Sequence, residues 1–165
     1  WGMQTWLALP DELEEMDPAF EQQLVLPVVE ENGVRATVIM GSLWGQQAPT
    51  TCHCPTIYAD IELSAGGEIM IEPEATERAV MLVSGGASLD GEPLQLYCLH
   101  LLNAGEPLRL VSDHGARVML MGGEPLYTPR FIWWNFVASS QERIRQATRD
   151  WQEGRFPAVP GDPDN

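Results

Sequence analysis

The sequence predicts an all-β fold, an antiparallel barrel followed by one C-terminal helix, and two observations support it. Short β-branched and apolar runs are separated by turn signals at short intervals, as in a sandwich or barrel. Only residues 139–154 combine a helix start signal with a helical apolar stripe. The turn signals are Asn32-Gly33, Gly66-Gly67, Gly85-Gly86, Asp90-Gly91, Ala104-Gly105 and His114-Gly115.

The clearest strand is TIYADIEL, residues 56–63, where apolar side chains alternate with polar ones and therefore share one face. The segment SLDGEPL, residues 88–94, predicts a hairpin with a type I′ turn at Asp90-Gly91. The other predicted strands are VRATVIMGSLW (34–44), GEIMIE (67–72), RAVMLV (78–83), QLYCLHLL (95–102), ARVMLMG (116–122) and RFIWWNFV (130–137).

The predicted helix begins with Ser139 and Glu142, which have the spacing of a capping box. Ile144, Ala147 and Trp151 follow at helical spacing and give it an apolar stripe that can lie on the barrel. Gly154 is a plausible stop, and the Pro-rich end of the chain, 156–165, predicts a surface tail.

The start of the chain has a different character. MQTWLALP, residues 3–10, reads as a strand, and residues 11–23 as an acidic connector with one or two helical turns. A strand separated from the barrel by such a connector needs another sheet to pair with, so we expect it to end a preceding domain. The chain opens at Trp1 without an initiator Met, which also favours a longer parent protein.

Composition excludes several classes of function. The net charge is −15, all nine basic residues are arginines, and lysine is absent. Lysine Schiff-base chemistry and a P-loop are therefore ruled out, and nucleic-acid binding is disfavoured. Three cysteines do not make a disulfide framework, and no run of 18 apolar residues occurs. We expect a cytoplasmic protein that does not span a membrane.

Several stretches resemble the pirin family of two-barrel cupin proteins: MQTWLALP, PTIYADIEL, ERAVMLVSG, LMGGEPL and, most specifically, RFIWWNFVASSQERI with the DW and GRFPAVPGD that follow. The resemblance implies a cupin-type antiparallel β-barrel, or jelly roll, with a C-terminal α-helix. It divides the chain into residues 1–23, the end of the N-terminal cupin with an acidic linker, residues 24–137, the C-terminal cupin barrel, and residues 138–165, the C-terminal helix and tail.

The resemblance also implies a metal, iron or another divalent ion, held by three histidines and a glutamate in the family's N-terminal cupin. Those positions lie upstream of Trp1, so none can be assigned here, and no cofactor is expected in this segment. Some family members open flavonols such as quercetin with dioxygen, and the human member is a nuclear cofactor.

The chain's own barrel could hold a second site. A metal-binding cupin strand pair reads H-x-H, then Glu, then a Gly that ends the next strand. Counting back from Gly85 puts Glu72 and Glu74 at the histidine positions and Glu77 or Arg78 at the glutamate position. The second motif, residues 106–109, offers no histidine. Iron and manganese favour imidazole together with carboxylate, so the favoured interpretation is a solvated mouth of the barrel that binds no metal. The alternative is a Ca²⁺ or Mg²⁺ ion held by Glu72, Glu74 and Glu77.

The other cysteines, histidines and tryptophans that could form a site are interpreted as structural residues. Cys52 and Cys54, on one face of a strand, lack the spacing and the second pair of a zinc site. His100 is expected to be a hydrogen-bonded core or edge residue, and His114 lies at a turn without a serine to make a triad. Trp133 and Trp134 would face opposite sides of a strand, one entering the barrel and the other meeting the helix.

The sequence thus favours a C-terminal, metal-free cupin module of a pirin-like protein with a structural, interaction or weak small-ligand role. One alternative is a quercetin 2,3-dioxygenase-like activity of the full-length protein, with its metal in the missing N-terminal cupin. Another is a regulatory partner-binding protein. Expected partners are the N-terminal cupin domain of the same protein or a homodimer mate joined through the edge of residues 3–9, and a small flat ligand; nucleic acid and membrane are not expected.

Overall fold

The computed structural model describes residues 2–157, which form two compact units. The sheet unit comprises residues 18–125, and the terminal unit joins residues 2–17 to residues 126–157. The division into residues 1–23, 24–137 and 138–165 stays a prediction. Trp1 and the end of the predicted tail, 158–165, lie outside the described residues.

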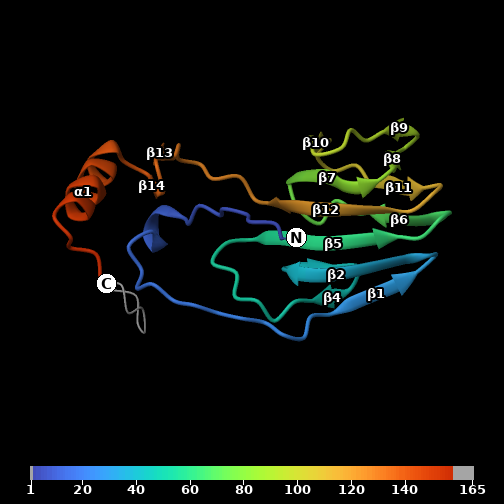
Figure 1. Ribbon diagram of the computed structural model, residues 1–165, viewed down its shortest axis with the longest axis horizontal. Coiled ribbons are helices and arrows are strands. Elements are labelled where there is room, and N and C mark those ends of the chain that lie inside the picture. Colours follow the sequence, from blue (N-terminus) through green and yellow to red (C-terminus); the bar gives the residue numbers. More distant parts are fainter. Residues whose placement is uncertain (1, 158–165) are drawn as a thin grey trace. The chain divides into compact units, whose positions relative to one another are not determined.

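The larger sheet of the sheet unit has six antiparallel strands in the order β1-β2-β5-β12-β7-β10 (Figure 1). Its strands are β1 Val28–Glu31, β2 Val34–Met40, β5 Thr56–Leu63, β7 Glu77–Gly85, β10 Leu99–Leu102 and β12 Ala116–Gly123. In β5 the burial alternates as the sequence predicts, with the side chains of Ile57, Ala59, Ile61 and Leu63 all buried.

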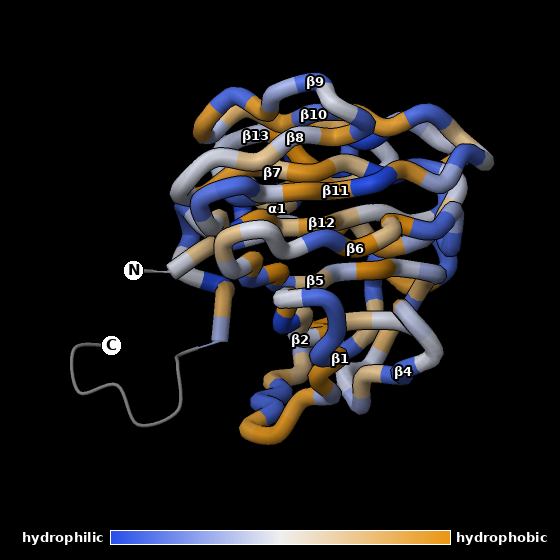
Figure 2. The backbone as a smooth tube through the Cα atoms, turned by 90° about the vertical axis from the view of Figure 1, so that its right-hand side faces the viewer, coloured by the Kyte–Doolittle hydropathy of each residue, from blue (hydrophilic) through white to orange (hydrophobic). Residues whose placement is uncertain are grey.

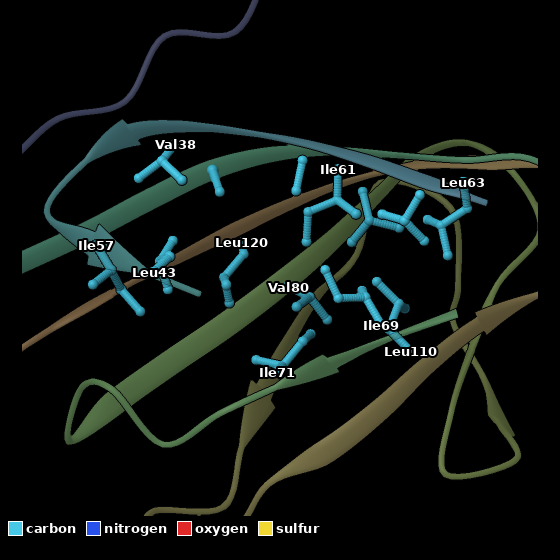
Figure 3. Close-up of a cluster of buried hydrophobic side chains, with 14 of the residues drawn as sticks. Val38, Leu43, Ile57, Ile61, Leu63, Ile69, Ile71, Val80, Leu110 and Leu120 are labelled. Atoms are coloured by element: carbon cyan, nitrogen blue, oxygen red, sulfur yellow. The ribbon is translucent and has the colours of Figure 1, made fainter. Parts of the chain in front are cut away.

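The smaller sheet has four strands in the order β6-β11-β8-β9. They are β6 Gly67–Ile71, β8 Ser88–Leu89, β9 Glu92–Pro93 and β11 Leu108–Ser112. Side chains from both sheets meet in one apolar core, including Ile61 and Val80 from the larger sheet and Ile69 and Leu110 from the smaller (Figure 3). Apolar stretches such as β7 and β11 stand out in Figure 2. The all-β, cupin-type fold with a C-terminal helix is therefore confirmed.

Two turns show how glycine shapes the chain. The predicted hairpin is present, with β8 paired to β9 and with positive φ at Asp90 (45°) and Gly91 (88°), as a type I′ turn requires. The predicted strand 34–44 is in fact broken at Gly41 (φ 74°) into β2 and β3 Ser42–Leu43, which pairs with β4 Gln46–Gln47. A Cβ on Gly41 would lie 2.0 Å from the Thr56 carbonyl oxygen, so no other residue fits there.

The terminal unit contains the short 3-10 helix η1 Asp11–Leu13, the hairpin β13 Phe131–Trp133 with β14 Phe136–Ala138, and helix α1 Gln141–Gln152. The single strand predicted over 130–137 is wrong, because the chain turns at Trp134, whose φ is 51°. Residues 3–10 form no ladder with any described strand. The strand predicted there was expected to pair with a sheet outside this chain, so it stays a prediction.

The helix begins one residue later than the capping box predicts. Ser140 is the N-cap, and its hydroxyl accepts a hydrogen bond from the Arg143 backbone N–H (3.2 Å). Glu142 pairs instead with Arg145 and Arg149. Gly154 (φ 65°) follows the helix and its N–H donates to the Trp151 carbonyl, so the predicted stop is confirmed. None of the helices in residues 2–157 is long and apolar enough to cross a membrane; a cytoplasmic location stays a prediction.

Candidate functional site

The candidate site lies where β6 ends and β7 begins, and its central residue is Arg78. Along β7 the side chains alternate, so Arg78 shares the inward face of Val80 and Leu82, which belong to the core. Only 3% of Arg78 is exposed to solvent. A buried arginine is rare unless every donor finds an acceptor, so its contacts decide what this end of the fold can do.

The Arg78 guanidinium links two separate loops through four backbone carbonyls. Its Nη1 donates to the carbonyls of Ile71 (3.2 Å) and Glu72 (3.0 Å), at the end of β6. Its Nη2 donates to those of Asn103 and Glu106 (both 2.7 Å), in the connection from β10 to β11. One cation thereby fastens together the two loops that carry the expected metal motifs.

Among the described residues, no carboxylate lies close enough to Arg78 to form an ion pair with it, and the Glu74 carboxylate interacts with its charge only at longer range. None of the ion pairs found within residues 2–157 includes Arg78. In the same part of the chain its Nε is buried without a hydrogen-bond acceptor. The four carbonyl oxygens are therefore the direct partners of the buried charge, as carbonyl oxygens are around a bound cation.

The glutamates of the first motif do not converge on a common point. Glu72, Glu74 and Glu77 are all solvent-exposed residues. Glu74 accepts a hydrogen bond from the Trp44 backbone N–H (3.1 Å), and its own N–H donates to the Glu72 carbonyl (2.9 Å). Partial burial raises the pKa of the Glu74 carboxyl, and the nearby Glu72 charge raises it further. The hydrogen bond from the Trp44 backbone N–H and the positive charge of Arg78 act in the opposite direction.

The second motif is also engaged in contacts of its own. The Glu106 carboxylate accepts from the Asn103 side-chain amide (2.9 Å), and Arg109 forms an ion pair with Glu68. The Arg109 backbone N–H donates to Asp90 (2.9 Å). The polar groups of this motif are therefore bonded to Asn103, Glu68 and Asp90 and do not meet around one common ligand.

The residues at this end do not fit a divalent metal. The guanidinium of Arg78 places a fixed positive charge against both loops, and this charge repels a second cation. Within residues 2–157 no three His, Cys, Asp or Glu side chains are arranged to hold a metal ion. The sequence placed Glu77 or Arg78 at the glutamate position, and the role of Arg78 was missed. The available signal was a lone arginine at an inward-facing position of an apolar strand.

The structure places the remaining candidates apart from one another. Cys52 and Cys54 are free thiols in an irregular segment before β5, not on a strand as predicted. His100 on β10 accepts a hydrogen bond at Nε2 from the Gln95 N–H (3.0 Å), which confirms a hydrogen-bonded edge histidine. His114 lies exposed in a bend between β11 and β12.

Trp133 and Trp134 belong to the terminal unit and neither is buried, so the prediction that one of them enters the barrel is wrong. Trp134 does meet the helix: its ring lies 5.1 Å from that of Trp151 and 5.8 Å from that of Phe136, both edge-to-face. Trp133 lines a groove of about 490 Å³ between the β13–β14 hairpin and α1. The groove is lined by Phe131, Ile132, Trp133, Gln141, Ile144, Arg145, Thr148 and Arg149.

The acidic start of the chain is held on this same unit by side-chain contacts. Glu14 accepts from the backbone N–H (2.9 Å) and the hydroxyl (2.7 Å) of Ser139. Glu15 pairs with Arg143, whose guanidinium lowers the pKa of the Glu15 carboxyl. The Arg130 guanidinium donates to the Leu9 carbonyl (2.6 Å). Ser139, the predicted cap, therefore anchors the connector instead.

Comparison with known proteins gives a consistent result. Residues 58–157 match the family model described as the pirin C-terminal cupin domain. A pirin-like protein of Caulobacter vibrioides is 40% identical over 158 residues, which are 94% of this chain and 54% of that protein. The chain spans about half the length of the curated relatives it matches.

Crystal structures of longer proteins have the same fold. A quercetin 2,3-dioxygenase from Acinetobacter baumannii superposes with a TM-score of 0.87 at 33% sequence identity, over 95% of this chain and 54% of that one. Another structure of a quercetin 2,3-dioxygenase from that organism, 22% identical, gives a TM-score of 0.83 over 93% of this chain and 56% of that one. The matched family model, the identity with the relatives and the shared fold lead to one conclusion: this chain belongs to the pirin family and contains its C-terminal cupin domain.

Proposed function

We propose that this chain is the metal-free C-terminal cupin module of a pirin-like protein and that its role is structural and interactive, not catalytic. The observation that carries the proposal is Arg78. A buried guanidinium joins the two motif loops where a metal-binding cupin uses an ion, so the fold is closed without one. The proposed partner is the N-terminal cupin domain of the same protein or a second copy.

Metal analysis of the purified 165-residue chain tests this proposal. The chain is exposed in turn to Fe²⁺, Mn²⁺ and Zn²⁺, desalted, and its metal content is measured. We expect well below one equivalent of each metal, and no difference between the wild-type chain and its Glu72→Ala and Glu74→Ala variants. Near-stoichiometric metal that either substitution abolishes would refute the metal-free role.

A quercetin 2,3-dioxygenase-like activity of the whole protein is the alternative, supported by the name of the Acinetobacter baumannii structure. In that case a metal bound in an N-terminal cupin would supply the chemistry, and this module would complete the protein around it. Oxygen uptake with quercetin should then be found for a full-length family member and be absent for the 165-residue chain. Turnover by the 165-residue chain alone would contradict both proposals.

A weak small-ligand role has one specific observation in its favour, the groove beside Trp133. Its lining combines aromatic and aliphatic side chains with Arg145 and Arg149, which suits a flat molecule. Titration with quercetin, followed by tryptophan emission, should show saturable quenching that Trp133→Ala removes. Trp6→Ala is the matched control, because Trp6 is similarly exposed in the same unit. Equal quenching in both variants would exclude the groove.

The regulatory alternative uses the acidic surface. A net charge of −15 favours basic protein partners through long-range attraction. Binding to a basic protein should then weaken steeply as salt is added, because salt screens exposed charges. Binding that does not depend on salt would contradict this alternative.

A further inference from the structure

One edge of the larger sheet lacks the features that usually keep sheet edges from pairing. β10 is the last strand in the order β1-β2-β5-β12-β7-β10, with β7 on one side and none of the described strands on the other. Its sequence, Leu-His-Leu-Leu, contains neither a charged residue nor proline. Natural proteins protect such edges with charge, proline or a bulge, because the free N–H and C=O groups are a template for another strand.

The other edges of the two main sheets are protected in these ways. β1 ends in Glu30 and Glu31, both exposed. β9 consists of Glu92 and Pro93. β6 carries Glu68, which forms an ion pair with Arg109 on the neighbouring strand. Of these edge strands, β10 therefore offers the least resistance to pairing with a strand of another molecule.

The side chains at this edge are apolar and face solvent. Leu99 and Leu101 lie on the outer face of the sheet, opposite in register to Met81 and Ala79, and are 50% and 82% exposed. Leu96 and Tyr97, in the turn before β10, are 48% and 67% exposed. We call these four residues the β10 patch. Apolar side chains gathered at one strand edge, in place of scattered ones, are typical of an interaction surface.

The turn that presents this patch is held in place by backbone hydrogen bonds. The Tyr97 N–H donates to the Leu82 carbonyl (2.9 Å), and the Cys98 N–H to the Gln95 carbonyl (3.3 Å). Tyr97 has a φ of 60°, in the left-handed region that is unfavourable for a bulky residue. The exposed tyrosine is therefore held in an unfavourable backbone conformation, and such conformations cluster at binding sites.

Charge identifies the partner. Two copies of a chain with net charge −15 repel each other, so their association is least opposed at a surface poor in carboxylates. The 13 residues between Glu92 and Glu106 contain no Asp, Glu or Arg. A basic partner would find no carboxylate in this segment to pair with, whereas an identical segment matches it in polarity and size.

We propose that the β10 patch is a homodimer interface, in which β10 of one copy pairs antiparallel with β10 of another around a two-fold axis. Centred on His100, this pairing sets Leu99 opposite Leu101 of the partner subunit on the outer face of the joined sheets. The edge of residues 3–9, which the sequence suggested for dimerisation, pairs with no described strand and stays a separate prediction. The inference deepens the interaction role proposed above and rests on it.

Sedimentation of the 165-residue chain over a range of concentrations, in low and in high salt, tests the interface. We expect a monomer–dimer equilibrium that tightens as salt screens the repulsion. Leu101→Glu should weaken dimerisation by about tenfold or more, the effect of losing roughly 1.4 kcal/mol at an interface. Leu24→Glu is the matched control, since Leu24 is 84% exposed outside any strand and the charge change is identical.

A second variant separates burial from net charge. Leu101→Lys makes the net charge less negative, so it should strengthen association if repulsion alone decided the equilibrium, and weaken it if the β10 patch is buried. A monomer at every concentration and salt, or equal effects of Leu101→Glu and Leu24→Glu, would overturn the interface. Neither result would alter the metal analysis, so the two proposals fail separately.

Discussion

Substitution of Arg78 by methionine tests directly whether a cation built into the chain closes the cupin fold. Methionine keeps most of the apolar length of the side chain and removes the guanidinium. Four carbonyl oxygens then lose their donor, those of Ile71, Glu72, Asn103 and Glu106. The loss falls on both loops at once, because Nη1 serves one loop and Nη2 the other.

The expected cost follows from the burial of these groups. Breaking a buried charged pair by removing one partner typically costs about 3–5 kcal/mol. Here the partners are neutral carbonyls, three of which bond to Arg78 in only partly buried positions, so water can replace some donors. Removing the charge also removes the cost of desolvating it. We expect Arg78→Met to lower the free energy of unfolding by about 2–4 kcal/mol.

Urea unfolding followed by far-UV circular dichroism measures this effect. Arg78→Lys keeps the charge but has three donors in place of the planar fork, so it should lose a smaller part of the stability. Arg35→Met is the control: Arg35 is half-exposed on the same unit and its ion pair with Glu30 is 3.5 Å long, so about 0–1 kcal/mol is expected. If Arg78→Met cost no more than Arg35→Met, the guanidinium would not be closing the fold.

Three further predictions concern the rest of the chain. Arg143 lowers the pKa of Glu15 from its ordinary 4.5, so their contact stabilises the fold above that pH and is lost as the pH falls through the lowered pKa. Glu15→Gln should therefore make the thermal unfolding temperature less sensitive to acid. An unchanged pH profile would refute this. At Trp134, with φ 51°, glycine should be about 1 kcal/mol more stable than alanine in chemical unfolding, the reverse of the usual order. Gly85→Ala should destabilise by more than about 2 kcal/mol, since its Cβ would lie 2.1 Å from the Gly115 carbonyl oxygen; wild-type stability would contradict the packing described.

Local patterns were sufficient for most of the sheet unit. The alternation in β5 predicts its buried face because strand side chains alternate whatever the strand pairs with. Asp90-Gly91 predicts its hairpin because two adjacent residues must both tolerate positive φ. Both features depend on a few neighbouring residues, and the tertiary contacts of the chain are compatible with them.

Where the prediction from sequence was wrong, a distant contact decided the outcome. Ser139 and Glu142 have the spacing of a capping box, but Glu14 takes the Ser139 hydroxyl and the cap passes to Ser140. The IWW run has the composition of one strand, yet Trp134 turns the chain and packs on Trp151. A partner more than one hundred residues away in the first case leaves no periodic trace in the local sequence.

The candidate site shows the same division. The sequence by itself determined the absence of histidine from both motifs, and with it the expectation of an end without a transition metal. Only the tertiary structure decided what stands there instead, because the acceptors of Arg78 are backbone carbonyls of residues 71, 72, 103 and 106. Every residue carries a carbonyl, so no choice of amino acids marks these four, and only the fold brings them together around one buried charge.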